Sequence, residues 1–300
     1  MITLDQLIQS WNAFFFEPVP VYTVALFRII FGIILLREAV FLMGNLGDYL
    51  GPNGMVSYER YYQRSHKKVL SLFLYLPGTM AATRLIMAMH FLFVLMMTLG
   101  LFTPISTALT FVTMRSIVNR NPALCNGGDN VSRTMCFYLI FASAGHAYSL
   151  DEYFFYAPTM PGKAYLLQSP WALRLMQIQV SIIYLYTTYW KLKGATYRQG
   201  TAIYYVMGNF FYRRFQLPKW MLRTPFVQML SWGTLAAEAM LGIGLWIKEF
   251  RYPTILLGLL LHLTIEYIVS VHLFGWYMMT SLLLFLDPMD VMHWVSQWLA

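Results

Sequence analysis

The run VYTVALFRIIFGIILLREAVFLM, residues 21–43, decides the fold class of this chain. A helix of about 20 apolar residues crosses about 30 Å of hydrocarbon, because each residue adds about 1.5 Å. Comparable runs recur from one end of the sequence to the other, at residues 21–43, 82–102, 105–118, 134–150, 171–189, 226–247, 253–271 and 272–286. The sequence therefore predicts an all-α fold, a polytopic transmembrane helical bundle of about eight spans, with seven and nine as the alternatives.

The composition agrees with a chain that is covered by lipid. Of its 300 residues, 58% are hydrophobic and 11% are charged, whereas about 25% of the residues of a soluble domain are charged. The net charge is +8, but the basic residues lie between apolar segments, where they set topology, so we expect a lipid bilayer and no nucleic acid as the partner. We predict one transmembrane domain over residues 1–300, with no soluble lumenal domain and no cleavable signal.

Three segments outside the spans have the character of interfacial structure. Leu4, Leu7, Ile8 and Trp11 repeat at helical spacing before two prolines, which predicts an amphipathic helix on the membrane surface. Residues 44–78 combine a Pro-Asn-Gly turn with tyrosines and basic residues. Residues 194–223 contain an aromatic run that is too short to span, so it lies at the interface or re-enters, and its basic residues place it on the cytoplasmic side.

Ionisable residues inside the spans are the informative positions, because each one costs about 2.5 to 3.5 kcal/mol at the centre of a membrane helix. They are Arg28, Arg37, Glu38, His90, Arg115, His146, Glu238, His262 and Glu266. Arg28 lies too deep to reach the interface, so its expected partner is a carboxylate, with Asp129, Glu238 and Glu266 as the choices, or a ligand anion. The alternative is an ion pair that does no more than fix the packing of helices.

His262 and Glu266 are four residues apart and therefore share one helix face. This spacing predicts a hydrogen bond through which the carboxylate orients the imidazole. A third convergent ligand is lacking in the sequence, so we predict no metal site.

Lys191 and His146 are the two titratable residues best placed for proton chemistry. A desolvated lysine can act as a base near neutral pH, and a histidine can donate or accept a proton. Tyr184, Tyr186, Tyr189 and Trp190 come just before or within two turns of Lys191, and we expect them to exclude water from it. The alternative is that Lys191 reaches the interface from its helix end and that the histidine is only hydrogen-bonded.

Four segments resemble the horizontally transferred transmembrane (HTTM) domain family, which includes the membrane domain of the vitamin K-dependent gamma-carboxylase. They are FFFEPVPVYTVALFRIIFGIILL, NRNPALCNGGDNVSRTMCFYLIF, SAGHAYSLDEYF and YLYTTYWKLKGATYRQGTAIYY, in the order and approximate spacing of the family. The resemblance extends from about residue 11 to residue 286. It also implies that the chain lies in a membrane, and the small tail-free members suggest the bacterial cytoplasmic membrane.

In the carboxylase a membrane-embedded lysine deprotonates vitamin K hydroquinone, so the resemblance implies an isoprenoid quinone as the cofactor. Lys191 in WKLKGATYRQG matches that lysine, and His146 in AGHAYSLD matches a functionally important histidine. Arg28, Asp129 and Arg133 match recurrent polar positions of the family. Two departures stand out: Trp190 replaces one of a pair of lysines, and the chain ends at Ala300 without the large lumenal region.

Three functions follow from these observations. The first is a membrane enzyme, carboxylase-like or a quinone-dependent oxidoreductase, with Lys191 and His146 as catalytic residues. Arg28, Asp129, Arg133, Glu238, His262 and Glu266 would then form the cofactor site or a buried polar network. The second is a non-enzymatic accessory factor that holds an exported peptide or a partner subunit; one small bacterial family member helps to mature and export a secreted peptide toxin. The third is a transporter, although the paired mid-membrane helix breaks of transporters are missing.

Overall fold

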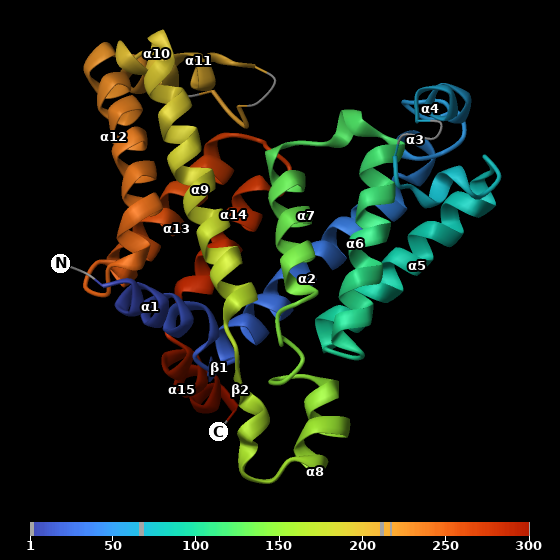
Figure 1. Ribbon diagram of the computed structural model, residues 1–300. Coiled ribbons are helices and arrows are strands. Elements are labelled where there is room, and N and C mark those ends of the chain that lie inside the picture. The colour runs from blue at the N-terminus through green and yellow to red at the C-terminus, as the bar shows by residue number, and fades with distance from the viewer. Residues whose placement is uncertain (1–2, 66–68, 211–212, 217, 300) are drawn as a thin grey trace. The chain divides into compact units, whose positions relative to one another are not determined.

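The computed structural model describes residues 3–65, 69–210, 213–216 and 218–299, and within these ranges most of the chain is helical (Figure 1). Two short strands, β1 (Val19–Pro20) and β2 (Leu167–Gln168), pair antiparallel with Val19 opposite Gln168. The predicted all-α fold class is confirmed.

Contacts divide the chain into two compact units, which are described separately below. The first unit is Met1–Arg174 together with Asp287–Ala300, and the second is Leu175–Leu286. A single domain over residues 1–300 stays a prediction.

The body of the first unit is a layer of long helices that pack in chain order. Its helices include α1 (Leu4–Phe16), α2 (Tyr22–Gly44), α3 (Leu46–Tyr49), α4 (Tyr58–Ser65), α5 (Met80–Leu99), α6 (Thr103–Arg120), α7 (Gly127–Leu139), α8 (Ala157–Thr159) and α15 (Pro288–Leu299). Helix α2 packs against α5, α5 against α6, and α6 against α7. The connection from α2 to α5 folds back on this layer through a cluster that includes Leu50, Tyr61 and Phe73, all of them buried.

The predicted amphipathic helix at the N-terminus is present as α1. Thr3 caps it, because its side chain accepts a hydrogen bond from the Gln6 backbone while the Gln6 side chain accepts one from Thr3. Leu4 and Trp11 are 71% and 61% exposed, and no residue of α1 is buried. An exposed apolar face of this kind is what a helix at a membrane surface requires.

The prediction of a membrane-spanning helix at residues 134–150 is wrong, because the helix in this region ends at Leu139. Helix α7 begins earlier, at Gly127, because Asn126 and Asp129 form a capping box there. It ends at Leu139, and the chain then turns through residues 140–149. A helix of 13 residues is about 20 Å long, which is shorter than the hydrocarbon layer.

The second unit is built on helices that approach closely. It contains the later part of α9 (Trp171–Lys193), followed by α10 (Ala195–Arg198), α11 (Ala202–Gly208), α12 (Thr224–Ile243), α13 (Arg251–Ile268) and α14 (Phe274–Leu282). Helix α13 packs against both α12 and α14. A Cβ atom at Gly258 of α13 would lie 2.6 Å from Leu282 and 2.7 Å from Leu241. The glycine therefore lets three helices meet, as small residues do in membrane bundles.

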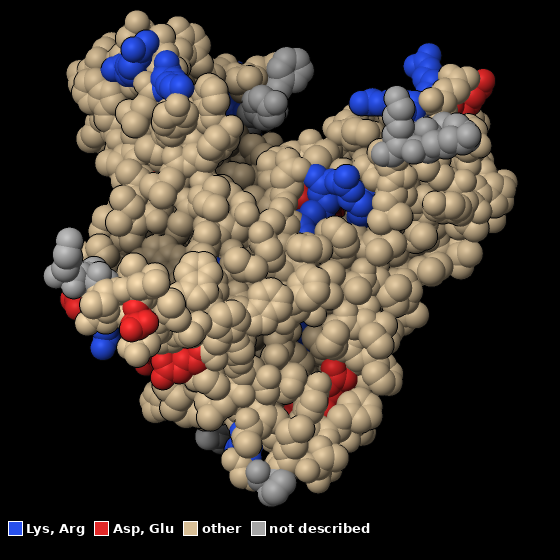
Figure 2. Space-filling model, viewed as in Figure 1, with Lys and Arg blue, Asp and Glu red and all other residues tan. Residues whose placement is uncertain are grey.

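Two helices of the described chain, Met80–Leu99 and Thr224–Trp246, are long and apolar enough to cross a membrane. The predicted count of eight spans is not confirmed. Helix α2 has the length, at 23 residues, but it carries Arg28, Arg37 and Glu38. The visible face is mostly free of charged side chains (Figure 2), and Val40 and Leu92 are half or more exposed. Such surfaces suit helices that face hydrocarbon.

Candidate functional site

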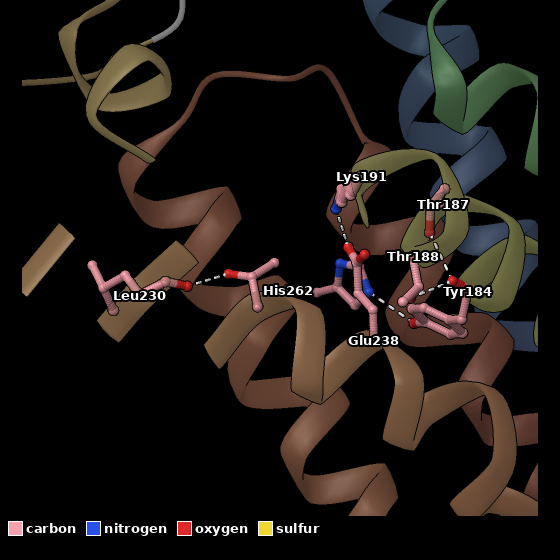
Figure 3. A network of polar contacts seen from close by, with 8 residues as sticks. Tyr184, Thr187, Thr188, Lys191, Leu230, Glu238 and His262 are labelled. Atoms are coloured by element: carbon pink, nitrogen blue, oxygen red, sulfur yellow. Dashed lines mark hydrogen bonds and ion pairs between the residues drawn. The ribbon is translucent and has the colours of Figure 1, made fainter. Parts of the chain in front are cut away.

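The candidate site lies in the second unit, where Lys191 at the end of α9 forms an ion pair with Glu238 of α12. The Lys191 Nζ atom donates a hydrogen bond to Glu238 Oε1. The lysine side chain is 26% exposed and the carboxylate 10% exposed, so the pair is largely removed from water. Figure 3 shows the lysine reaching toward the carboxylate from a neighbouring helix.

A second polar contact adjoins this ion pair. Tyr184 lies two turns before Lys191 on α9, and its hydroxyl is 2.8 Å from Nε2 of His262 on α13. Both side chains are buried, at 2% and 3% exposure. The four residues gather in one place (Figure 3), with the ammonium of Lys191 within electrostatic range of the imidazole. Three helices thus bring an acid, a base, an imidazole and a phenol together.

Two buried atoms of this cluster have no hydrogen-bond partner among the described residues. They are Glu238 Oε2 and His262 Nδ1. An unsatisfied buried polar atom costs about 1 to 3 kcal/mol, so native structures keep few of them, and chiefly where a function or a bound group accounts for them. Because both atoms lie beside a buried ion pair, we take this cluster as the candidate functional site.

The predicted hydrogen bond between His262 and Glu266 is wrong. His262 turns to Tyr184, while Glu266 Oε1 accepts a hydrogen bond of 3.0 Å from Arg214 Nη2. Their spacing does place both residues on one helix face, but a guanidinium group binds a carboxylate more strongly than a neutral imidazole does. Glu266 therefore belongs to a surface ion pair outside the cluster.

The expected aromatic shield around Lys191 is also different. Tyr184 is buried in the cluster, but Tyr186, Tyr189 and Trp190 are 60%, 51% and 52% exposed. The ring that covers the ammonium is that of Tyr197, whose centroid lies 5.3 Å from Nζ. Consecutive helix residues point in different directions, so only a fraction of the nearby aromatics can face the lysine.

Arg28 lies in the first unit, and the carboxylates near it are not the three acids expected from the sequence. The guanidinium is fully buried and donates hydrogen bonds of 2.6 Å to the backbone carbonyls of Ala144 and Tyr148. Asp151 and Glu152, and none of the three acids named from the sequence, are its electrostatic neighbours. Arg28 holds the turns after α7 in place.

His146 lies in that turn segment of the first unit, whereas Lys191 and its partners belong to the second unit. Its ring stacks on Tyr156, with centroids 4.1 Å apart and planes 12° from parallel. Its Nδ1 atom is 3.2 Å from the Ser143 carbonyl oxygen, which suits an Nδ1–H donor and leaves Nε2 as the basic nitrogen.

Asp151 is a key residue of the same segment that sequence reasoning missed. Its carboxylate is buried and accepts three hydrogen bonds of 2.7 Å, from the backbone N–H groups of Phe102 and Thr103 and from the Thr103 hydroxyl. It therefore caps α6 from 48 residues away. The motif that ends in Ser-Leu-Asp thus has a structural role in this chain.

Asp129 and Arg133 lie together in the first turns of α7. Asp129 completes the capping box with Asn126, and Arg133 donates from Nε to the Asp129 carbonyl at 3.1 Å. Burial is the main cause that raises the pKa of the Cys125 thiol just before this helix. The Asp129 carboxylate raises that pKa further, and Arg133 opposes the shift. Within the described ranges, no three His, Cys, Asp or Glu side chains converge as metal ligands would.

The sequence model of the HTTM domain family matches residues 16–289, which is most of the chain. The chain belongs to the HTTM domain family. It is also similar to the sporulation-delaying protein SdpB of Bacillus subtilis (strain 168), with 30% identity over 134 residues. The match covers 41% of this chain and 40% of that relative. No solved structure matches the chain.

Proposed function

We propose that this HTTM protein is a multi-pass enzyme of the bacterial cytoplasmic membrane, with about eight spans, that moves protons on a lipid-soluble substrate of the isoprenoid quinone class. The observation that carries the proposal is the Lys191–Glu238 ion pair, packed beside the Tyr184–His262 contact. Ionisable groups within apolar helices are costly, and where they occur they commonly serve proton or ligand pathways.

Lys191 supplies the base as a free amine, which is the form that abstracts a proton from a substrate. Its own proton passes to water, because the lysine side chain is 26% exposed. Glu238 holds the lysine in the site through the ion pair. Substrate that closes the site against water strengthens the electrostatic contacts inside it.

The unpartnered atoms of the cluster fit the polar groups of a quinol. Glu238 Oε2 is an acceptor for a hydroxyl group. When the Tyr184 hydroxyl donates to His262 Nε2, the Nδ1 atom carries the proton and is a donor for the oxygen of the second hydroxyl group, or for the carbonyl oxygen of the oxidised quinone. When bound, a hydroquinone would supply an acidic hydroxyl and two electrons.

The test is the quinone content of purified protein, measured by mass spectrometry after detergent extraction and gel filtration. Wild-type protein should carry close to one quinone per chain, and Glu238→Gln and His262→Phe should lose most of it. Glu249→Gln is the matched control, because Glu249 is exposed in the same unit. No quinone above the level of empty detergent, or equal retention in all variants, contradicts the proposal.

The second proposal is a non-enzymatic accessory role, in which the chain holds a peptide or partner subunit. The chain is similar to SdpB over 134 residues, and the small bacterial members that the family resemblance brings in suggest such a role. The Lys191–Glu238 pair would then fix helix packing without chemistry. A peptide or small protein that co-purifies in place of quinone supports this role.

A further inference from the structure

An open cleft of roughly 280 Å³ lies in the first unit between α6 and α7, and no residue of the Lys191 cluster lines it. Arg115 of α6 and Asn130 and Arg133 of α7 line its polar part. Phe111 and Phe137 line its apolar part. Figure 2 shows basic side chains gathered over these two helices.

The polar part presents donors for an anion. Arg115 is half-buried, and within the described part of the chain its guanidinium makes no hydrogen bond or ion pair. Arg133 donates to the Asp129 carbonyl and to the Asn130 side chain through Nε and Nη2, which leaves Nη1 available. Among the described residues, no carboxylate side chain lines the cleft. Two guanidinium groups therefore line the cleft, and the acids Glu38 and Asp129 line a neighbouring pocket with Arg133 and not the cleft itself.

The position of the cleft on α7 adds to this preference. Asn130 and Arg133 lie in the first two turns of a 13-residue helix. The N-terminal turn carries a partial positive charge, which favours an anion nearby. Guanidinium groups are well matched to phosphate, because their N–H groups form paired hydrogen bonds with its oxygens.

The apolar part continues directly from the polar part. Phe111 lies one turn from Arg115, and Phe137 lies one turn from Arg133. Their rings are 5.6 Å apart, and Phe141 continues the row at 5.4 Å from Phe137. Phe137 and Phe141 are 43% and 48% exposed. One face of the helix pair thus changes from basic to aromatic over about two turns.

We propose that this cleft binds an anionic phospholipid, with the headgroup phosphate between Arg115 and Arg133 and an acyl chain along Phe111, Phe137 and Phe141. A free phosphate ion would use the same guanidinium groups. It would gain nothing from the exposed aromatic row, whose burial by about one acyl chain is favourable by the hydrophobic effect. A zwitterionic lipid would bring a cation that the two arginines repel.

The test is native mass spectrometry of the full chain, titrated separately with phosphatidylglycerol, with phosphatidylcholine of the same acyl chains and with inorganic phosphate. Wild-type protein should prefer phosphatidylglycerol. Arg115→Gln should weaken its binding about tenfold, the loss of one charge-assisted contact, whereas Arg115→Lys should lose less. Arg60→Gln is the matched control, because Arg60 is exposed in the same unit and outside the cleft.

Asn130→Asp is a second variant that tests the cleft even if the Arg115→Gln protein does not fold. Asn130 is exposed, so the change should be tolerated, and its new carboxylate should occupy Arg133 and repel the phosphate. Equal binding of phosphatidylcholine and phosphatidylglycerol overturns the proposal. The proposal is also overturned if inorganic phosphate saturates the protein without displacing phosphatidylglycerol. Unchanged phosphatidylglycerol binding by Asn130→Asp overturns it as well.

Discussion

Replacing Asp151 should lower the free energy of unfolding of the first unit more than replacing an exposed acid does. The buried carboxylate accepts three hydrogen bonds of 2.7 Å at the start of α6. Asp151→Ala leaves the buried N–H and hydroxyl groups of Thr103 and the part-buried N–H group of Phe102 without their acceptor, and each buried group costs about 1 to 3 kcal/mol. We expect a total loss of about 3 to 5 kcal/mol in the free energy of unfolding. Asp151→Asn keeps one accepting oxygen and should lose about half as much.

The chain offers its own reporter for this measurement. It contains two cysteines, and Cys136 on α7 is fully buried. In a Cys125→Ser background, a fluorescent maleimide therefore reacts with Cys136 only when the first unit opens. Asp48→Ala is the control, because Asp48 is exposed. If Asp151→Ala and Asp48→Ala showed the same labelling temperature, the assignment of Asp151 as a remote helix cap would be wrong.

Three further outcomes are expected, each measured as thermal unfolding in detergent. Arg28→Lys should destabilise the protein by about 2 kcal/mol, because an ammonium cannot span two carbonyls as a guanidinium does; Arg84→Lys, at an exposed site, should not. Gly100→Ala should cost about 1 to 3 kcal/mol, because Gly100 has a φ of +70° and a Cβ there would lie 2.5 Å from Arg28 Nη1. Tyr184→Phe should cost about 1 kcal/mol by leaving His262 Nε2 unpaired.

Much of the fold follows from local sequence signals. The apolar run at residues 82–102 predicts α5 closely, and the spacing of Leu4, Leu7 and Trp11 predicts α1. The start of α7 was also readable, because Asn126 and Asp129 have the three-residue spacing of a capping box. The predicted span was placed later, on the apolar run that follows, because hydropathy does not distinguish a helix from a series of buried turns.

The candidate site was predictable in its residue types but not in its pairs. Lys191, Glu238 and His262 stand out in the sequence as charges and an imidazole within apolar runs. Their partners come from other helices, with 47 residues between Lys191 and Glu238 and 78 between Tyr184 and His262. Contacts over such separations depend on tertiary packing, which no spacing rule encodes. From the sequence, Tyr184 was therefore predicted as part of an aromatic shield around Lys191 and not as the partner of His262.

The central claim is that Lys191 acts as a base on a quinol. A deprotonated quinol gives its two electrons to dissolved oxygen and becomes a quinone, so the most direct test is oxygen uptake by purified protein in lipid nanodiscs supplied with a reduced isoprenoid quinol. Lys191→Arg keeps the charge and the ion pair with Glu238 but cannot release a proton at neutral pH. Wild-type protein should consume oxygen above empty nanodiscs, and Lys191→Arg should lose at least about 99% of that rate, as expected for removal of a general base. Equal rates for wild-type and Lys191→Arg protein, or no uptake by either, would contradict the account.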